Sequence, residues 1–401
     1  MGDISSVGEE FALAQLPDLR CHEPSVSNGC SIRNDGAIEN YCCAQGFGKR
    51  KVSVVRDIAR RVHFESVTTP ILKKLRVPVV GAPMAGGPST PELARAVSEA
   101  GGLGMIAGAL LTPDAFAAQV DSMRGLVFGV NLFLPEEPSG ADVDSYAQHL
   151  ASWFERFDAE PGVLKRRDDY YPEKFAWLLA HPVPVVSSTF ATFDADEVAQ
   201  LHSVGTEVWA TVATASDASI ATANGVDALV VQGPEAGGHR GTFDGSAPEE
   251  PLTELLVAVR EISDLPRIAA GGLMDGNDIA PLLDSGAAHA AQLGTAFLNT
   301  PEAGTKPVHR EQLSSASGTA VTKAFSGRPA RGLVNEFMRE NSDAAPLAYP
   351  DLHYLTAPMR AKAAAAGDPS GLSMWAGTGY RRAQAKPAAE LVAEWARQLG
   401  R

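Results

Sequence analysis

Short apolar runs alternate with amphipathic segments along most of the chain. Apolar runs of strand length begin near residues 77, 103, 126, 183, 207, 228, 267 and 289. Segments with helical spacing lie between several of them, at residues 91–100, 194–204, 217–223, 251–262 and 276–285. Such alternation is typical of a parallel sheet covered by helices. Eight units predict an α/β fold, a closed (β/α)8 TIM barrel over residues 62–300. An open doubly wound sheet is the alternative, but no G-x-G-x-x-G sequence follows a strand.

Three stretches depart from this alternation. Residues 135–182 are a longer, more polar insertion into the barrel, with an amphipathic helix around 143–157. We expect residues 301–401 to form an additional small, mostly helical subdomain that packs at the barrel mouth. Its helical patterns lie at 306–315, 335–341, 351–366 and 388–399, and an extended stretch lies at 323–334. Residues 1–61 are polar and lack sustained periodicity, which predicts a disordered leader.

Composition narrows the class of partner. The chain has 401 residues and a formal charge of −14, which argues against a nucleic-acid or anionic-membrane partner. No apolar stretch approaches the roughly 20 residues of a membrane span, and we see no secretory signal. All four cysteines, Cys21, Cys30, Cys42 and Cys43, lie in the leader and lack the C-x2-C spacing of zinc sites. Because the rest of the chain has no cysteine and so needs no disulfide, we expect a cytoplasmic protein. Because the cysteine spacing does not match a zinc site, we expect no metal site.

The predicted strand ends carry glycines and neutral polar groups, and TIM barrels keep their functional residues at these ends. His239 lies in a glycine-rich loop, residues 233–241, that follows the strand ending at Gln232. Imidazole is the side chain that titrates nearest pH 7. The last two strands run into Gly271–Gly272 and Gly294–Thr295, whose backbone N–H groups could bind a phosphate. Together with amides such as Asn131, these features suit flavin mononucleotide (FMN), although the residues alone leave another phosphorylated ligand open.

Several motifs in this order resemble the nitronate monooxygenases, formerly called 2-nitropropane dioxygenases, which are FMN-dependent TIM-barrel enzymes. The motifs are PVVGAPMAGGPSTPELARAVSEAGGLG, GVNLF, VQGPEAGGHRG, AAGGL and QLGTAFL. They cover roughly Pro70 to Glu336, and the first 60 residues match nothing in the family pattern.

The resemblance implies residue roles and an activity. It implies that FMN is contacted by Met84, Asn131, Gln232, Gly237, Gly272, Gln292, Gly294 and Thr295. It implies that His239 is the catalytic base and that alkyl nitronates, or nitroalkanes, are oxidised by O2 to carbonyl compounds and nitrite. Imidazole has a pKa suited to removing a carbon-bound proton near neutral pH. Ser187 and Ser188 either hydrogen-bond substrate oxygens or cap the strand end. Arg240 either adds positive charge to the site or points to solvent.

Two other functions stay open at this point. Flavin-dependent enoyl-ACP reductases and NAD(P)H:quinone reductases share the barrel and a similar GGH segment, so His239 does not separate them from the monooxygenases. The insertion and the GLVNEF segment favour the monooxygenases. A non-catalytic barrel that binds FMN or another phosphate ligand is the second alternative. The oligomeric state is also open, with a homodimer among the options.

Overall fold

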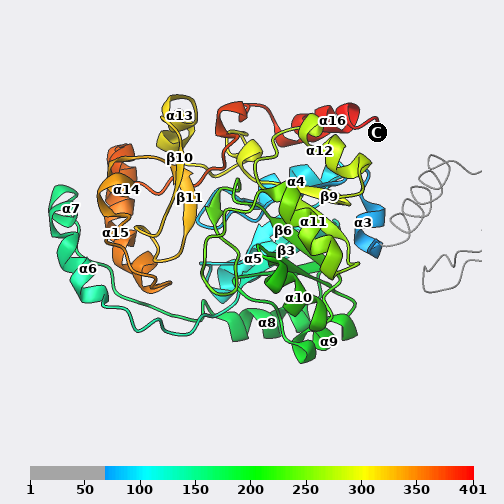
Figure 1. Cartoon of the computed structure of the whole chain (residues 1–401), viewed down its shortest axis with the longest axis horizontal. Coiled ribbons are helices and arrows are strands. Elements are labelled where there is room, and N and C mark those ends of the chain that lie inside the picture. The colour runs from blue at the N-terminus through cyan, green and yellow to red at the C-terminus, as the bar shows by residue number, and fades with distance from the viewer. Residues whose placement is uncertain (1–67) are drawn as a thin grey trace, which may run out of the picture. The chain divides into compact units, whose positions relative to one another are not determined.

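The structure, a computed structural model, describes residues 68–401 (Figure 1). The predicted leader at residues 1–61 and its four cysteines lie outside the described residues. Within residues 68–401, no helix is both long and apolar enough to cross a bilayer, and no three His, Cys, Asp or Glu side chains gather as metal ligands would.

Eight parallel strands form one sheet that closes on itself. They are β1 (Val79–Gly81), β2 (Gly104–Ala107), β3 (Phe128–Phe133), β4 (Val185–Thr189), β5 (Glu207–Val212), β6 (Ala228–Gln232), β8 (Arg267–Ala270) and β9 (Ala290–Leu293). Their spatial order is β1-β9-β8-β6-β5-β4-β3-β2. A parallel bridge between Val80 and Leu103 joins β1 to the chain just before β2 and closes the barrel. The predicted (β/α)8 fold and its eight strands are therefore confirmed.

Strand residues alternate between two apolar layers, because successive side chains of a strand point to opposite faces. Val185 and Trp209 belong to the cluster inside the barrel, where both are fully buried. Their neighbours Val186 and Val208 belong to the cluster between the strands and the surrounding helices. Both faces of the sheet are therefore covered, which is why its strands are nearly continuous apolar runs.

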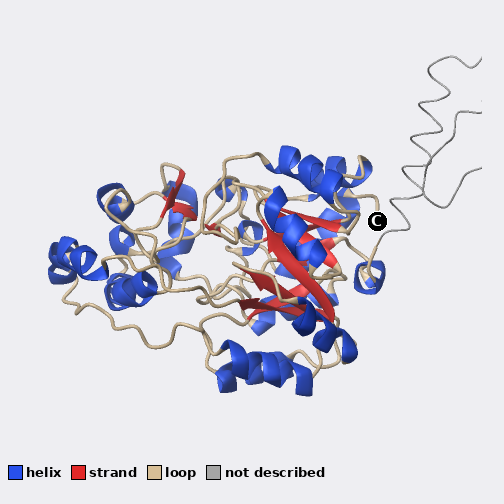
Figure 2. Cartoon of the chain, turned by 60° about the horizontal axis from the view of Figure 1, so that its bottom comes forward, coloured by secondary structure: helices blue, strands red, loops and turns tan. Residues whose placement is uncertain are grey.

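Helices surround the barrel strands (Figure 2). They include α3 (Pro70–Lys74), α4 (Pro91–Glu99), α5 (Pro113–Ser122), α8 (Tyr171–Ala180), α9 (Ala195–Ser203), α10 (Ala215–Ala223), α11 (Leu252–Ile262), α12 (Gly276–Asp284) and α16 (Ala388–Gln398). Thr90 caps α4 by accepting a hydrogen bond from the Leu93 amide, and Asp194 begins α9 with a capping box. The C-terminal α16 packs its apolar face against α4 and α12.

A second group of helices lies beside the barrel, at the left of Figure 1. We call them the cap helices: α6 (Val143–His149), α7 (Ala151–Arg156), α14 (Glu336–Asn341) and α15 (Asp351–Ala366). Trp153 of the insertion packs edge-on against Phe337, with 5.0 Å between ring centroids, inside one buried cluster. The single helix predicted around 143–157 is thus two consecutive helices, α6 and α7, which pack on the C-terminal region, while the third helix of the insertion, α8, packs on the barrel.

A small antiparallel sheet connects the cap region to the loop that carries His239. It consists of β7 (Gly238–His239), β10 (Thr319–Thr322) and β11 (Ala330–Leu333), in the order β10-β11-β7. His239 pairs with Ala330. The sequence predicts one extended stretch at 323–334; the structure has a turn over its first half and strand β11 over its second half. Helix α13 (Pro307–Ser315) precedes β10 in the chain.

Candidate active site

A cavity of about 260 Å³ lies at the C-terminal ends of the barrel strands. Its wall contains all the residues predicted to contact a cofactor, together with His239: Met84, Asn131, Gln232, Gly237, Gly272, Gln292, Gly294 and Thr295. The structure therefore brings these residues into one site, as expected for groups at one end of a barrel. Their contact with a flavin remains a prediction.

Ser187 and Ser188 do not line the cavity. Ser187 lies beneath Asn131 and accepts a hydrogen bond from its amide, with 2.9 Å between Nδ2 and Oγ. Ser188 points to the other face of β4 and is fully buried. Thr189, the next residue of β4, reaches the cavity instead. We therefore assign neither serine a contact with substrate, because strand alternation and the depth of Ser187 keep both away from it.

The side-chain amide of Asn131 is held in one orientation. Its Nδ2 donates to the Ser187 carbonyl at 3.2 Å and to Thr189 Oγ1 at 3.1 Å, in addition to the bond to Ser187 Oγ. Among the described residues, nothing donates to Asn131 Oδ1. This carbonyl oxygen is therefore available to accept a hydrogen bond from a ligand N–H group, as a pyrimidine edge would offer.

Gln232 orients the loop that carries the histidine. Its Nε2 donates to the His239 carbonyl at 3.0 Å, and its Oε1 accepts from the Gly241 amide at 2.8 Å. Both ends of the amide are thus engaged by the loop. Although Gln232 lines the cavity, its observed role is to position His239.

The hydrogen bonds of His239 determine which ring nitrogen is free. His239 Nε2 lies 2.9 Å from Ser326 Oγ, and Ser326 Oγ lies 3.3 Å from the carbonyl oxygen of Arg328. A carbonyl only accepts, so the arrangement that satisfies both contacts has Ser326 donating to Arg328 and accepting from Nε2–H. In that tautomer Nδ1 carries the lone pair and is the atom that can take a proton.

Aromatic rings surround the imidazole. The ring centroids of Phe190 and Tyr349 lie 5.7 Å from that of His239, and that of Trp375 lies 5.5 Å away. Burial, together with the positive charge of Arg328 and of Arg360, lowers the pKa of His239 to about 3. The imidazole is therefore neutral at working pH and can accept a proton, although a pKa this far below 7 makes it a weaker base than a free imidazole.

Three histidines of the cavity should make the protein less stable in acid. Burial lowers the folded-state pKa of His239 to about 3, of His309 to about 4 and of His353 to about 2, from the ordinary 6.5. As the pH falls from 6.5 toward 4, the unfolded chain binds protons that the folded protein does not, so the free energy of unfolding decreases. We expect a loss of about 2 kcal/mol per histidine at pH 5 relative to pH 8. Urea unfolding between pH 5 and pH 8 measures this loss. A free energy of unfolding that stays constant, or that increases toward pH 5, would contradict the prediction.

The cavity also contains two cations that sequence reasoning missed. The side chain of Lys306 makes no hydrogen bond or ion pair among the described residues. The half-buried Arg360 donates only to neutral oxygens and to the His353 ring, for example to Thr356 Oγ1 at 3.0 Å and to the His353 carbonyl at 2.7 Å. Burial and the charge of Arg360 lower the pKa of Lys306. Uncompensated positive charge of this kind favours an anionic ligand.

Arg240 does not reach the site, and it does not point to solvent. Its side chain is buried, and its Nη1 donates to the Gly233 carbonyl at 2.5 Å. Its own amide donates to the Pro329 carbonyl at 2.8 Å. Both interpretations offered by the sequence are therefore wrong, and Arg240 instead fixes the loop on either side of His239.

The two glycine-ended strands form one polar end of the cavity. Gly271 and Gly272 have φ angles of +120° and +71°. Within residues 68–401, no acceptor is found for the amide N–H groups of Gly272, Leu273, Gly294 or Thr295. Unpaired amides next to residues with positive φ form an anion-binding concavity. The residues present therefore fit the phosphate of a mononucleotide.

Comparison with known proteins gives one consistent family. A family model described as nitronate monooxygenase matches residues 69–397. The nitronate monooxygenase of Pseudomonas aeruginosa is 38% identical over 338 residues, covering 79% of this chain and 95% of the relative. A probable nitronate monooxygenase of Bacillus subtilis is 36% identical over 321 residues, covering 77% of this chain and 91% of the relative.

Solved structures show the same similarity. The nitroalkane oxidase of Streptomyces ansochromogenes superimposes with a TM-score of 0.80 and 45% identity, covering 83% of this chain and 98% of that chain. FabK from Thermotoga maritima is less similar, with a TM-score of 0.64 and 26% identity over 84% of this chain and 97% of that chain.

Proposed function

The chain belongs to the nitronate monooxygenase family, and from this premise we propose that it oxidises alkyl nitronates, and the parent nitroalkanes, with FMN and O2. The products would be carbonyl compounds and nitrite. The observation that carries the proposal is a neutral, half-buried histidine in the same cavity as an unpaired cluster of backbone amides.

The residues that would hold FMN follow from the cavity wall. The amides of Gly272, Leu273, Gly294 and Thr295 would bind the phosphate, because they have no other acceptor among the described residues. Asn131 Oδ1 would accept a hydrogen bond from the pyrimidine edge. When bound there, FMN would supply the redox chemistry that transfers electrons from the substrate to O2.

The protein's own residues would bind the anion and move the proton. His239 Nδ1 would take the α-proton of a neutral nitroalkane, a step worth about 10²- to 10⁴-fold in rate for a well-placed base. Lys306 and Arg360 would favour the nitronate anion in the cavity. The rings of Phe190, Tyr349 and Trp375 would keep water away from the imidazole.

A product assay without nicotinamide tests the proposed function. The purified protein, loaded with FMN, should consume O2 and release nitrite when given ethyl nitronate or propyl-2-nitronate alone. No nitrite with these substrates, but oxidation of NADH or NADPH with a quinone or an enoyl thioester, would support the reductases instead. Flavin binding without turnover in either assay would support the non-catalytic alternative.

A further inference from the structure

A small cleft of about 10 Å³ lies against the outer side of the active-site cavity. Leu110, Phe133 and Tyr349 line both spaces and so form the wall between them. Leu110 is 37% exposed, whereas Tyr349 is 9% exposed. Leu110 is therefore the part of this wall that solvent and an incoming ligand can reach.

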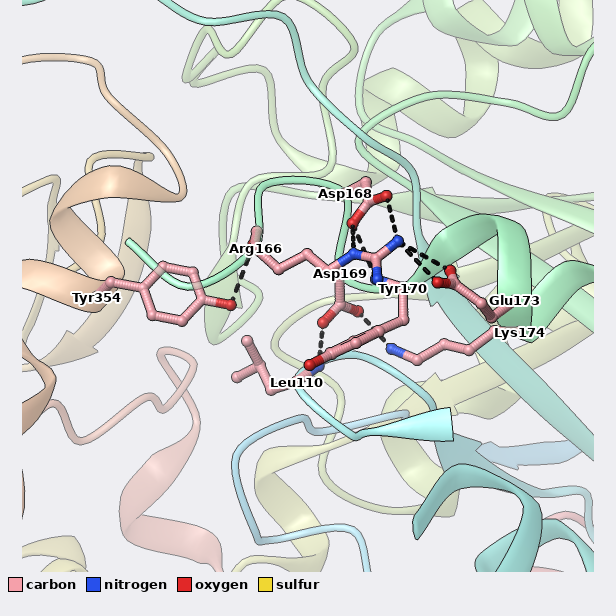
Figure 3. A network of polar contacts seen from close by, with 8 residues as sticks. All are labelled: Leu110, Arg166, Asp168, Asp169, Tyr170, Glu173, Lys174 and Tyr354. Carbon is pink, nitrogen blue, oxygen red and sulfur yellow. Dashed lines mark hydrogen bonds and ion pairs between the residues drawn. The ribbon is translucent and has the colours of Figure 1, made fainter. Parts of the chain in front are cut away.

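The backbone of Leu110 is held in an unusual conformation. Its φ is +65°, in the left-handed region that leucine seldom adopts. Its amide donates to Asp169 Oδ1 at 2.9 Å, as Figure 3 shows. Because Asp169 belongs to the insertion, a residue far away in the sequence holds Leu110 at the edge of the cavity.

A buried ion pair fixes Asp169 in turn. Asp169 Oδ2 accepts from Lys174 Nζ at 2.8 Å, and the Lys174 side chain is only 1% exposed (Figure 3). Asp169 and the next residue, Tyr170, also have positive φ angles, of +50° and +58°. A buried charge that loses its partner must move or become neutral. The position of Leu110 therefore depends on this pair.

The same segment holds the other side of the cleft. The Tyr354 hydroxyl, on α15, donates to the Arg166 carbonyl at 3.1 Å (Figure 3). Arg167 makes a two-point contact with Asp351, at 2.6 and 2.8 Å. Asp351 begins α15, two residues after Tyr349. Residues 166–174 thus connect Leu110 to the part of the chain that packs on His239.

We propose that Leu110 is the end wall of a subsite for the alkyl chain of the substrate, and that the Asp169–Lys174 pair sets its position. This proposal rests on the proposed function. The wall that faces the cavity consists of Leu110, Phe133 and Tyr349 and is apolar, whereas the cleft behind it is also lined by the charged residues Glu136, Arg166, Arg167, Asp168 and Asp169. The chemical class is therefore a linear aliphatic chain, which extends from the nitronate carbon near His239 to this wall.

Straight-chain carboxylates, acetate to hexanoate, test the subsite because they are planar anions that are not oxidised. Their Kd values for the FMN-loaded protein can be read from the change in flavin absorbance. Each methylene that reaches apolar surface should tighten binding roughly fourfold. In the wild type this gain should stop when the chain reaches Leu110. In Leu110→Ala it should continue for one or two more carbons, so that the hexanoate-to-acetate affinity ratio rises roughly tenfold.

Leu347→Ala is the matched control. Leu347 is also exposed, at 46%, and it lines neither the cavity nor the cleft. Its replacement should leave the chain-length profile unchanged. If Leu110→Ala gives the wild-type ratio, or weakens all carboxylates by the same factor, the subsite is overturned.

The double variant Asp169→Asn/Lys174→Met tests the ion pair. It removes both charges but keeps a side-chain oxygen for the Leu110 amide. We expect its hexanoate-to-acetate ratio to move in the same direction as that of Leu110→Ala, by a smaller factor. Asp275→Asn, which breaks the 2.7 Å pair with Arg382, is the control and should not move the ratio. A wild-type ratio in the double variant would overturn the positioning role of the ion pair.

The subsite and the proposed function can fail separately. If Leu110→Ala changes the hexanoate-to-acetate ratio but the protein oxidises no nitronate, the subsite stands and the proposed function is refuted.

Discussion

Replacing His239 with Asn should lower kcat/KM for a neutral nitroalkane by a factor of about 10² to 10⁴. The imidazole is half-buried among aromatic rings and neutral, so it can accept a carbon-bound proton. Asn is similar in size but has no basic nitrogen. FMN should stay bound, because the amides that fit its phosphate lie on other strands. Steady-state rates with nitroethane and with ethyl nitronate measure the effect.

The comparison between the two substrates is what makes this prediction specific. A nitronate has already lost its α-proton, so its oxidation should fall far less than that of the nitroalkane. Ser326→Ala keeps the imidazole but removes the hydroxyl that accepts from Nε2–H, so we expect a smaller loss, again mainly on the nitroalkane. Equal losses on both substrates would mean that His239 does not act mainly as a base.

Replacing Gly271 with Ala should weaken FMN binding at least about 100-fold, which corresponds to about 2.7 kcal/mol. Gly271 has a φ of +120°, a conformation that an L-residue hardly adopts. An added Cβ would lie 3.1 Å from the Ala236 amide nitrogen and 3.2 Å from the Gly233 carbonyl oxygen. The chain must therefore move, and the amides of Gly272 and Leu273 move with it. Titration of the flavin-free protein with FMN, followed by quenching of flavin fluorescence, gives the Kd.

Gly205→Ala is the control for the effect of backbone strain alone. Gly205 also has a positive φ, +82°, but an added Cβ would meet nothing within 4 Å. Its replacement should cost about 1 kcal/mol of stability and leave the FMN affinity unchanged. If Gly271→Ala binds FMN as tightly as the wild type, the phosphate does not lie at this end of the cavity.

The barrel could be predicted because its signals are local. Each strand is an apolar run whose two faces are both buried, and Thr90–Pro91 begins its helix with a cap and a proline. The same signal, Thr112–Pro113, begins α5, a helix that the sequence prediction passed over. The sheet formed by β7, β10 and β11 could not be found in this way. Its pairing of Gly238 with Arg331 depends on tertiary packing and not on a local pattern.

The residues of the candidate site likewise fall into those with a local sequence signal and those placed only by tertiary packing. Residues at strand ends, such as Asn131 and Gly272, could be placed because barrel geometry brings these ends together. Lys306 and Arg360 come from the region after residue 301, where the sequence pattern predicts helices but not which strands they face. The contact between His239 and Ser326 spans 87 residues and has no local signal.

An anaerobic absorbance spectrum of the FMN-loaded protein tests the central proposal most directly. One sample would receive an alkyl nitronate and the other NADH or NADPH. We predict that the nitronate alone changes the oxidised flavin spectrum, with no need for a nicotinamide. A spectrum that changes only with NADH or NADPH would contradict the proposal and place the protein among the reductases. Failure to bind FMN at all, even after reconstitution, would exclude both enzymes.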